Sequence, residues 1–120
     1  MRLAELYLIR AEAETYGVGN GVSGAVADLN TIRNRAGLPN YSGAAIQGQG
    51  LTAIYHERQV EFFSEWGHRW LDLKRTGLVN TVMPAVDTQK GGTWSPYKQL
   101  YPILLTDIKA DPNLSQNSGY

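Results

Sequence analysis

Apolar residues recur at helical spacing over residues 2–16, where they form two faces rather than one. The first face carries Leu3, Ala4, Tyr7, Leu8 and Ala11, and the second, roughly opposite, carries Leu6, Ile9, Ala13 and Tyr16. A helix that is apolar on two sides packs against two partners. We therefore predict a helix with one face left uncovered when this chain is alone. The residues whose exposure decides this are Leu3, Leu6, Tyr7 and Ile9.

A single apolar stripe predicts a second helix over residues 22–36. Gly37 stands where a glycine commonly follows a helix, Leu38 supplies the apolar contact that accompanies it, and Pro39 prevents continuation. The two helices form an αα-hairpin similar in length to one tetratricopeptide unit. No second copy of this unit occurs in the sequence.

Two further helices are predicted, over residues 51–66 and 68–76, after a glycine-rich and polar loop at residues 39–50. The stripe of the third helix is Leu51, Ile54, Tyr55, Arg58, Phe62 and Trp66. Beyond Met83 we expect little regular structure, except for an extended stretch and one helical turn within residues 100–108. The sequence thus predicts an all-α fold: a TPR-like helical hairpin, two further helices and a loop-rich C-terminal tail, in a single domain over residues 1–120.

Charge and composition narrow the classes of function. Eleven basic residues balance eleven acidic ones, and no Lys/Arg cluster forms a footprint for a phosphate backbone, so we expect no nucleic-acid partner. The absence of cysteine excludes disulfides, thiolate chemistry and cysteine-ligated zinc. No apolar run is long enough to span a bilayer, and the first five residues, with the acidic Glu5 among them, are unlike a signal peptide.

Three segments carry a resemblance to a known family: LYLIRAEA with residues 27–38, then residues 51–77, and then residues 100–120. Their order and spacing resemble the C-terminal region of the SusD/RagB family over nearly the whole chain. Its structural signature here is Glu57, Arg58, Glu61, Arg69, Trp70 and Asp72. The chain departs from the usual Pro-Ile-Pro at residues 102–104 and from Asn-Pro-Gly-Tyr at residues 117–120, losing a proline each time.

The resemblance implies a surface-exposed lipoprotein of Bacteroidetes, anchored by lipid in the outer membrane and facing outward. Such proteins capture oligosaccharides, or sometimes peptides, and release them to a TonB-dependent transporter resembling SusC. The resemblance implies no chemical step, so we expect neither an enzyme nor a cofactor. Family members run to several hundred residues and begin with a signal peptide and an acylated cysteine. We therefore expect this chain to be a fragment that lacks the anchor.

Several motifs suggest chemistry, but each has a simpler structural explanation. Gly19-x-Gly21-x-x-Gly24 matches a dinucleotide fingerprint in letters only, because a helix and not a strand precedes it. Glu57, Glu61 and Glu65 share one helical face, whereas a glycosidase needs carboxylates on both sides of a cleft. We expect them to form ion pairs with Arg58, Arg69 and neighbouring elements.

His56 and His68 are the only histidines, and His68 with Asp72 offers too few ligands for a metal site, so we predict none.

The aromatic residues leave more than one possibility open. We predict that Phe62 and Trp70 are mostly buried, with an Arg69–Asp72 pair beside Trp70, although Trp70 could instead lie under a sugar ring. Trp94 and Tyr97 lie in a loop-like segment and are equally sensible as sugar contacts or as covers of the chain's own core. Much of the family's ligand contact comes from segments N-terminal to this one, so no binding residue is carried over. The alternative function is a standalone helical module that binds a protein partner, with no glycan role.

Overall fold

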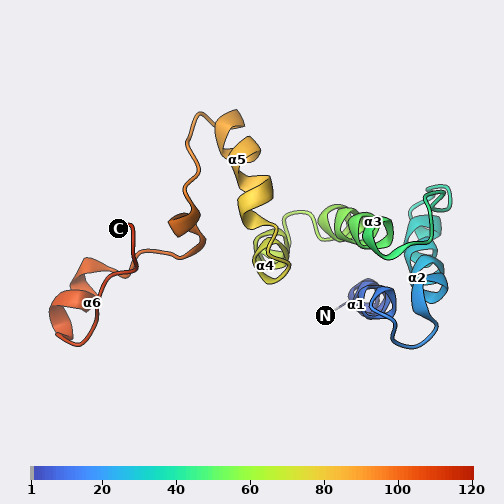
Figure 1. Ribbon diagram of the computed structural model, residues 1–120, viewed down its shortest axis with the longest axis horizontal. Coiled ribbons are helices and arrows are strands. Elements are labelled where there is room, and N and C mark those ends of the chain that lie inside the picture. Colours follow the sequence, from blue (N-terminus) through green and yellow to red (C-terminus); the bar gives the residue numbers. More distant parts are fainter. Residues whose placement is uncertain (1) are drawn as a thin grey trace. The chain divides into compact units, whose positions relative to one another are not determined.

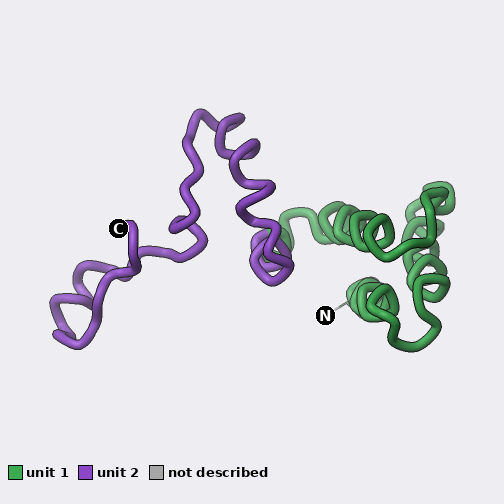
Figure 2. The backbone as a smooth tube through the Cα atoms, in the orientation of Figure 1, with its two compact units in different colours: residues 1–69 green, residues 70–120 purple. Residues whose placement is uncertain are grey.

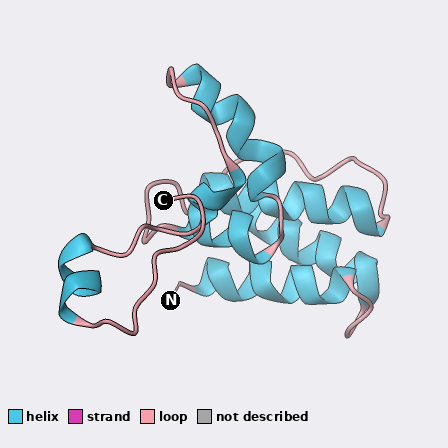
Figure 3. Ribbon diagram, turned by 60° about the vertical axis from the view of Figure 1, so that its left-hand side comes forward, coloured by secondary structure: helices cyan, strands magenta, loops and turns pink. Residues whose placement is uncertain are grey.

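The computed structural model describes residues 2–120, and the regular elements among them are helices (Figures 1 and 3), which confirms the all-α fold class. In chain order they are α1 (Leu3–Thr15), α2 (Gly21–Arg35), α3 (Gln47–Glu61), α4 (His68–Arg75), α5 (Val79–Gln89), the 3₁₀ turn η1 (Pro96–Gln99) and α6 (Leu105–Ala110). The chain divides into two compact units, residues 1–69 and residues 70–120, with the division inside α4 (Figure 2). The assignment of both to a single domain stays a prediction.

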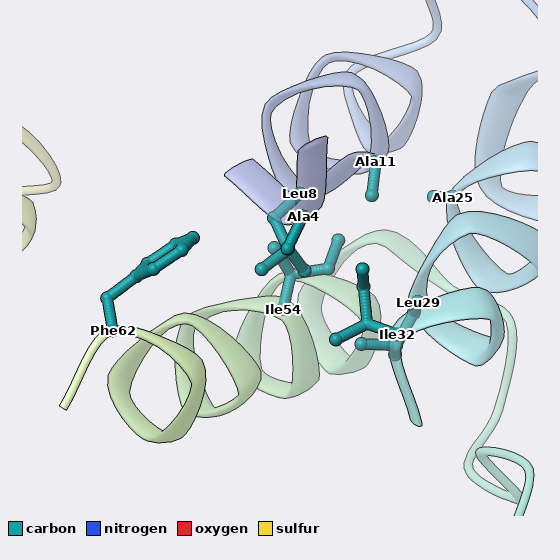
Figure 4. Packing of buried hydrophobic residues seen from close by; sticks show 8 residues of the cluster. All are labelled: Ala4, Leu8, Ala11, Ala25, Leu29, Ile32, Ile54 and Phe62. Atoms are coloured by element: carbon teal, nitrogen blue, oxygen red, sulfur yellow. The ribbon is translucent and has the colours of Figure 1, made fainter. Parts of the chain in front are cut away.

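The first unit, residues 1–69, has its core where α1, α2 and α3 meet. Leu8 of α1, Leu29 of α2 and Ile54 of α3 are almost completely buried and lie close together (Figure 4). Burying one such side chain contributes about 1.5–3 kcal/mol. The remaining members of the core are Ala4, Ala11, Ala25, Ile32 and Phe62. The stripe predicted for the second helix therefore faces the core, and so does the first of the two predicted faces of α1.

The other face of α1 is uncovered, as predicted. Leu3 is 69% exposed, Leu6 48% and Ile9 47%, whereas Tyr7 is half-buried against the core. Leu3 belongs with the uncovered residues, although its spacing grouped it with Leu8. The chain therefore presents a row of large apolar side chains along α1 to solvent, a feature that usually marks an interaction surface when it is contiguous.

A bidentate ion pair joins α1 to α2 at the edge of this core. Arg10 donates from Nε and Nη2 to the two carboxylate oxygens of Asp28, each at 2.6 Å. The hydrogen bond with Asp28, and then its charge, raise the pKa of Arg10 above its ordinary value. Asp28 is buried, so the pairing supplies the charge-assisted hydrogen bonds that a buried carboxylate requires.

The predicted bounds of the third helix were wrong at both ends. The helix begins at Gln47 and not at residue 51, because its first turn includes Gly48 and Gly50, which the sequence analysis had assigned to a loop. Gly50 is buried, and a Cβ there would lie at an ordinary contact distance, 3.6 Å, from the Thr15 methyl, so this turn packs against the end of α1.

The third helix ends at Glu61, because the next residues form turns in which Ser64 and Trp66 have positive φ. Trp66 is therefore not on the apolar stripe, and it is 91% exposed.

The expectation of little regular structure after Met83 was also wrong. Helix α5 continues through Pro84 to Gln89, and η1 and α6 follow. Pro84 removes only one backbone donor and lies on the exposed side, while Val79, Val82, Met83 and Val86 keep an i, i+3, i+4, i+7 spacing. The extended stretch and helical turn expected within residues 100–108 do occur, since α6 begins at Leu105.

The end of the chain in the second unit, residues 70–120, is held by side chains that bond to backbone. Gln116 accepts the Ile103 N–H at 2.8 Å and donates to the Ile103 carbonyl at 2.9 Å. Asn117 donates to the Tyr101 carbonyl at 2.7 Å, and the Tyr120 hydroxyl donates to the Leu100 carbonyl at 2.6 Å. These bonds attach residues 116–120 along residues 100–103 without forming a strand. We name this arrangement the tail clip.

Candidate functional site

Two aromatic side chains of the second unit, Trp94 and Tyr101, lie against Trp70. The ring of Trp94 meets Trp70 edge-on, with centroids 6.2 Å apart and planes at 73°. The ring of Tyr101 lies 6.4 Å from Trp70 at 56°, and the Lys74 ammonium lies 5.9 Å from the Trp70 ring. We name Trp70, Trp94 and Tyr101 the aromatic cluster. The three residues come from α4, from the segment before η1 and from the extended stretch after η1. Three separate segments of the second unit therefore form the cluster.

The orientation of Trp94 is fixed by a hydrogen bond as well as by its neighbour. Its indole Nε1–H donates to the Asn80 side-chain oxygen at 3.0 Å. Asn80 lies in the first turn of α5, a helix that was not predicted from the sequence. A tryptophan with a satisfied N–H and a packed edge has little freedom to turn, so Trp94 is held in place before any ligand arrives.

Tyr97 belongs to a second aromatic contact, at the end of the chain. Its ring meets that of Tyr120 at 83°, with centroids 4.9 Å apart. Gly119 has φ of +100°, and a Cβ there would fall 2.4 Å from Tyr97 Cγ, so only glycine permits this approach. Tyr97 therefore packs against the tail clip.

The cluster offers an aromatic surface to solvent. Tyr101 is 71% exposed, while Trp70 and Trp94 are half-buried. Flat rings with electron-rich faces attract the polarised C–H groups of a sugar ring, and the tyrosine hydroxyl can bond sugar hydroxyls at the edge. The sequence analysis missed Tyr101. Its signal was a tyrosine beside Pro102, in a stretch with no helical period to draw it into a core.

The acidic residues of α3 are bound to arginines, as expected, although mainly to those of neighbouring elements. Glu57 pairs with Arg33 of α2 at 3.1 Å. Glu61 pairs with Arg35 of α2 at 2.6 Å, and Arg2, just before α1, reaches both Glu61 at 3.4 Å and Glu65 at 2.9 Å. Carboxylates neutralised in this way tie α3 to α1 and α2. They do not face one another across a cleft, as a glycosidase requires.

The other signature residues are also engaged in structure. The Arg58 guanidinium is buried and lies over the Phe62 ring, 5.3 Å from its centroid. Asp72 pairs with Arg75 at 2.8 Å, and the macrodipole favours such a cation in the last turn of α4. The Arg69–Asp72 pair stays a prediction. Phe62 is buried as predicted, whereas Trp70 is only half-buried.

The two histidines have different surroundings. His68 stacks on Phe62 with ring centroids 4.8 Å apart, and His56 is exposed on α3. Within residues 2–120 no three His, Cys, Asp or Glu side chains come together as a possible metal site.

The glycine motif between α1 and α2 surrounds a carboxylate of the chain itself. Glu14 is buried, its Oε1 accepts the Asn20 N–H at 3.4 Å, and a Cβ on Gly24 would fall 2.5 Å from its Oε2. A carboxylate already occupies the helix N-terminus that a pyrophosphate would need, and it would repel that anion. This arrangement explains the glycines without a nucleotide.

None of the helices that the structure describes combines the length and apolarity needed to cross a membrane.

Comparisons with known proteins agree with one another. A family model described as the SusD family matches residues 1–120. The starch-binding protein SusD of Bacteroides thetaiotaomicron is 35% identical over 123 residues, covering 99% of this chain and 21% of that protein. A crystal structure of a SusD superfamily protein from Bacteroides vulgatus superposes with a TM-score of 0.82 at 28% identity, covering 100% of this chain and 27% of that one. The chain thus spans about a fifth to a quarter of these relatives.

Proposed function

The chain belongs to the SusD family over residues 1–120, and from this premise we propose that it forms part of a cell-surface nutrient-binding protein that captures oligosaccharides. The observation that carries the proposal is the match of the family model to the whole chain. The relative from Bacteroides thetaiotaomicron bears the name starch-binding protein, which favours a glucan among the possible oligosaccharides. The role is binding without a chemical step, and no cofactor takes part.

Within this chain, the aromatic cluster is the place that best suits a sugar. Trp94 is pre-positioned by Asn80, and Tyr101 is exposed beside Trp70. Pre-positioned rings lose little conformational entropy when a ligand stacks on them. Tyr97 is a weaker candidate, because its ring is partly used by Tyr120.

Titration with maltoheptaose, followed by isothermal calorimetry, tests this role. We expect Trp94→Ala and Tyr101→Ala each to weaken binding roughly tenfold, the change that corresponds to about 1.4 kcal/mol. Trp66→Ala is the matched control, because Trp66 is exposed but lies outside the cluster, in the first unit. Unchanged affinity in both cluster variants, with binding retained, would move the sugar site elsewhere. Absence of binding to maltoheptaose and to other oligosaccharides would contradict the glycan role of this chain.

The further steps of the proposed role concern the intact protein. We propose that it is lipid-anchored and outward-facing on the outer membrane and releases its ligand to a SusC-like TonB-dependent transporter. The upstream coding sequence tests the anchor, because it should contain a signal peptide followed by a cysteine. Copurification with the product of an adjacent transporter gene tests the partner, and absence of such a gene would count against it.

The alternative is a helical module that binds a protein partner and no glycan. The exposed row of Leu3, Leu6 and Ile9 on α1 favours an apolar partner surface. Replacing Leu6 and Ile9 by serine should then reduce association, measured by light scattering across a concentration series. Under this alternative the unsubstituted chain has no affinity for maltoheptaose. Saturable binding of the sugar would therefore contradict it.

A further inference from the structure

The first unit contains a groove that uses none of the residues of the aromatic cluster. It lies where the segment after α2 returns to the start of α3 (Figure 1). Its volume is about 410 Å³, within the range of roughly 300–1,000 Å³ that is usual for small-molecule sites. It is lined by Arg33, Tyr41, Gln49, Thr52, Ala53 and His56.

The wall formed by residues 39–44 is pinned at three points. Arg33 Nε donates to the Pro39 carbonyl at 3.0 Å. The Tyr41 N–H donates to the Asn30 side-chain oxygen at 2.7 Å, and the Ala44 N–H donates to the Gln49 side-chain oxygen at 3.0 Å. Such bonds hold the segment against α2 and α3, so the groove is shaped before a ligand enters it.

The polar groups that border the groove are mainly hydrogen-bond donors. Arg33 uses Nε for Pro39 and one Nη1 position for Glu57, which leaves donors of its five N–H groups for a ligand. The oxygen of Gln49 is already used, so its amide NH₂ faces new partners. The exposed ring of His56 supplies at least one more N–H. A ligand that suits these groups carries acceptors, and a carboxylate suits the guanidinium best.

The groove also has an apolar side. It is formed by Tyr41 and Ala53, which pack against the hydrophobic core. A ligand that fits both the aromatic face and the row of donors has a ring with an apolar face and a carboxylate at its edge. Glu57 contacts the guanidinium through a single oxygen at 3.1 Å, so this pair leaves part of the arginine fork open.

We propose that this groove binds one acidic sugar residue, a hexuronate, with its carboxylate toward Arg33 and His56 and its ring against Tyr41. The choice of a sugar over another ring acid rests on the proposed function. The carboxylate preference does not, because it follows from the donors alone. The site shares no residue with the aromatic cluster.

The experiment titrates the whole chain with methyl glucuronide, methyl glucoside and benzoate, followed by amide chemical shifts. We expect saturable shifts at residues 41, 49, 53 and 56 with methyl glucuronide, and an affinity at least roughly tenfold above that for methyl glucoside. Tyr41→Ala and Gln49→Ala should each remove most of this binding. Tyr41→Phe keeps the ring and should retain it, which separates loss of the contact from loss of the fold.

Trp66→Ala, at an exposed residue outside the groove and the cluster, should leave the affinity for methyl glucuronide unchanged. Loss of glucuronide binding with maltoheptaose binding retained, or the reverse, distinguishes failure here from failure of the aromatic cluster. Equal affinity for the glucuronide and the glucoside would overturn the acidic preference. Benzoate binding as tightly as the glucuronide would overturn the sugar assignment. No shift at residues 41–56 up to saturating ligand would overturn the site itself.

Discussion

The two units of this chain are held together by different means. In residues 1–69, three helices bury a shared apolar core that includes Leu8, Leu29 and Ile54. In residues 70–120, Leu73 and Val79 are the buried apolar side chains, and the tail clip works through side-chain-to-backbone hydrogen bonds. A helix that packs against other helices needs apolar residues at helical spacing, and this spacing is visible in the sequence. The tail clip needs only a few polar residues at particular positions. The difference explains why the first unit can be predicted from the sequence and the second largely cannot.

Ionic contacts follow the same division. In the first unit they join helix to helix, as Arg10–Asp28 and Arg33–Glu57 do, and their carboxylates are buried. In the second unit Lys98–Asp87 and Arg75–Asp72 join residues closer in sequence, and their carboxylates are only partly buried. Exposed pairs contribute about 0–1 kcal/mol, whereas removing one partner of a buried pair costs several.

The largest effect should come from truncating the buried aromatic of the first unit. Phe62→Ala removes a ring that packs in the core and lies under Arg2 and Arg58, so we expect it to lower the free energy of unfolding by about 3–5 kcal/mol. Trp70→Ala, at a half-buried position, should cost clearly less. Urea unfolding followed by circular dichroism measures both. Equal losses would mean that Trp70 belongs to a core as firm as that of Phe62.

Next in size is the bidentate pair of α1 and α2. Asp28→Asn keeps the shape but removes the charge that binds Arg10, and we expect a loss of about 1.5–3 kcal/mol. The matched control is Asp87→Asn, whose carboxylate is more exposed than that of Asp28 (23% against 8%), with an expected loss below about 1 kcal/mol. Equal losses of stability in the two variants would contradict the conclusion that ion pairs contribute more in the first unit than in the second.

A smaller effect tests the contact between Gly24 and Glu14. Gly24→Ala puts a methyl group 2.5 Å from a buried carboxylate oxygen, so we expect a cost of about 1–3 kcal/mol from overpacking. In a Glu14→Ala background the same change should become favourable by about 0.5–1 kcal/mol, because alanine suits a helix better than glycine. A double-mutant cycle by urea unfolding provides the measurement. No change of sign between the backgrounds would show that the carboxylate moves aside freely.

The smallest effect on global stability should come from the tail clip. Gln116→Ala removes both bonds to the Ile103 backbone, and local opening of residues 100–103 should become easier by about 0.5–1.5 kcal/mol. Amide hydrogen exchange at Ile103 should speed up, while exchange in α1 to α3 stays the same. Gln99→Ala, whose amide bonds only within η1, serves as the control. Faster exchange throughout the first unit would mean that the two units are energetically coupled.

Most of the first unit could be predicted because its elements are long and periodic. The bounds of α1 and α2 agree with the prediction to within one residue. The errors fall where local signals compete with packing. Gly48 and Gly50 suggested a loop but lie inside α3, whose first turn packs against Thr15 of α1. Pro84 suggested a break but lies on the exposed side of α5.

The sequence by itself determined the all-α class, the helical hairpin, the uncovered face of α1 and the resemblance to the SusD/RagB family, because residue order and helical period are local properties. Only the tertiary structure decided how side chains distant in sequence meet. It placed Tyr101 beside Trp70, bound Glu57 and Glu61 to arginines of α2, and formed a groove between Tyr41 and His56. Such contacts depend on how distant segments of the backbone pack together. The spacing of residues within one helix does not predict that packing.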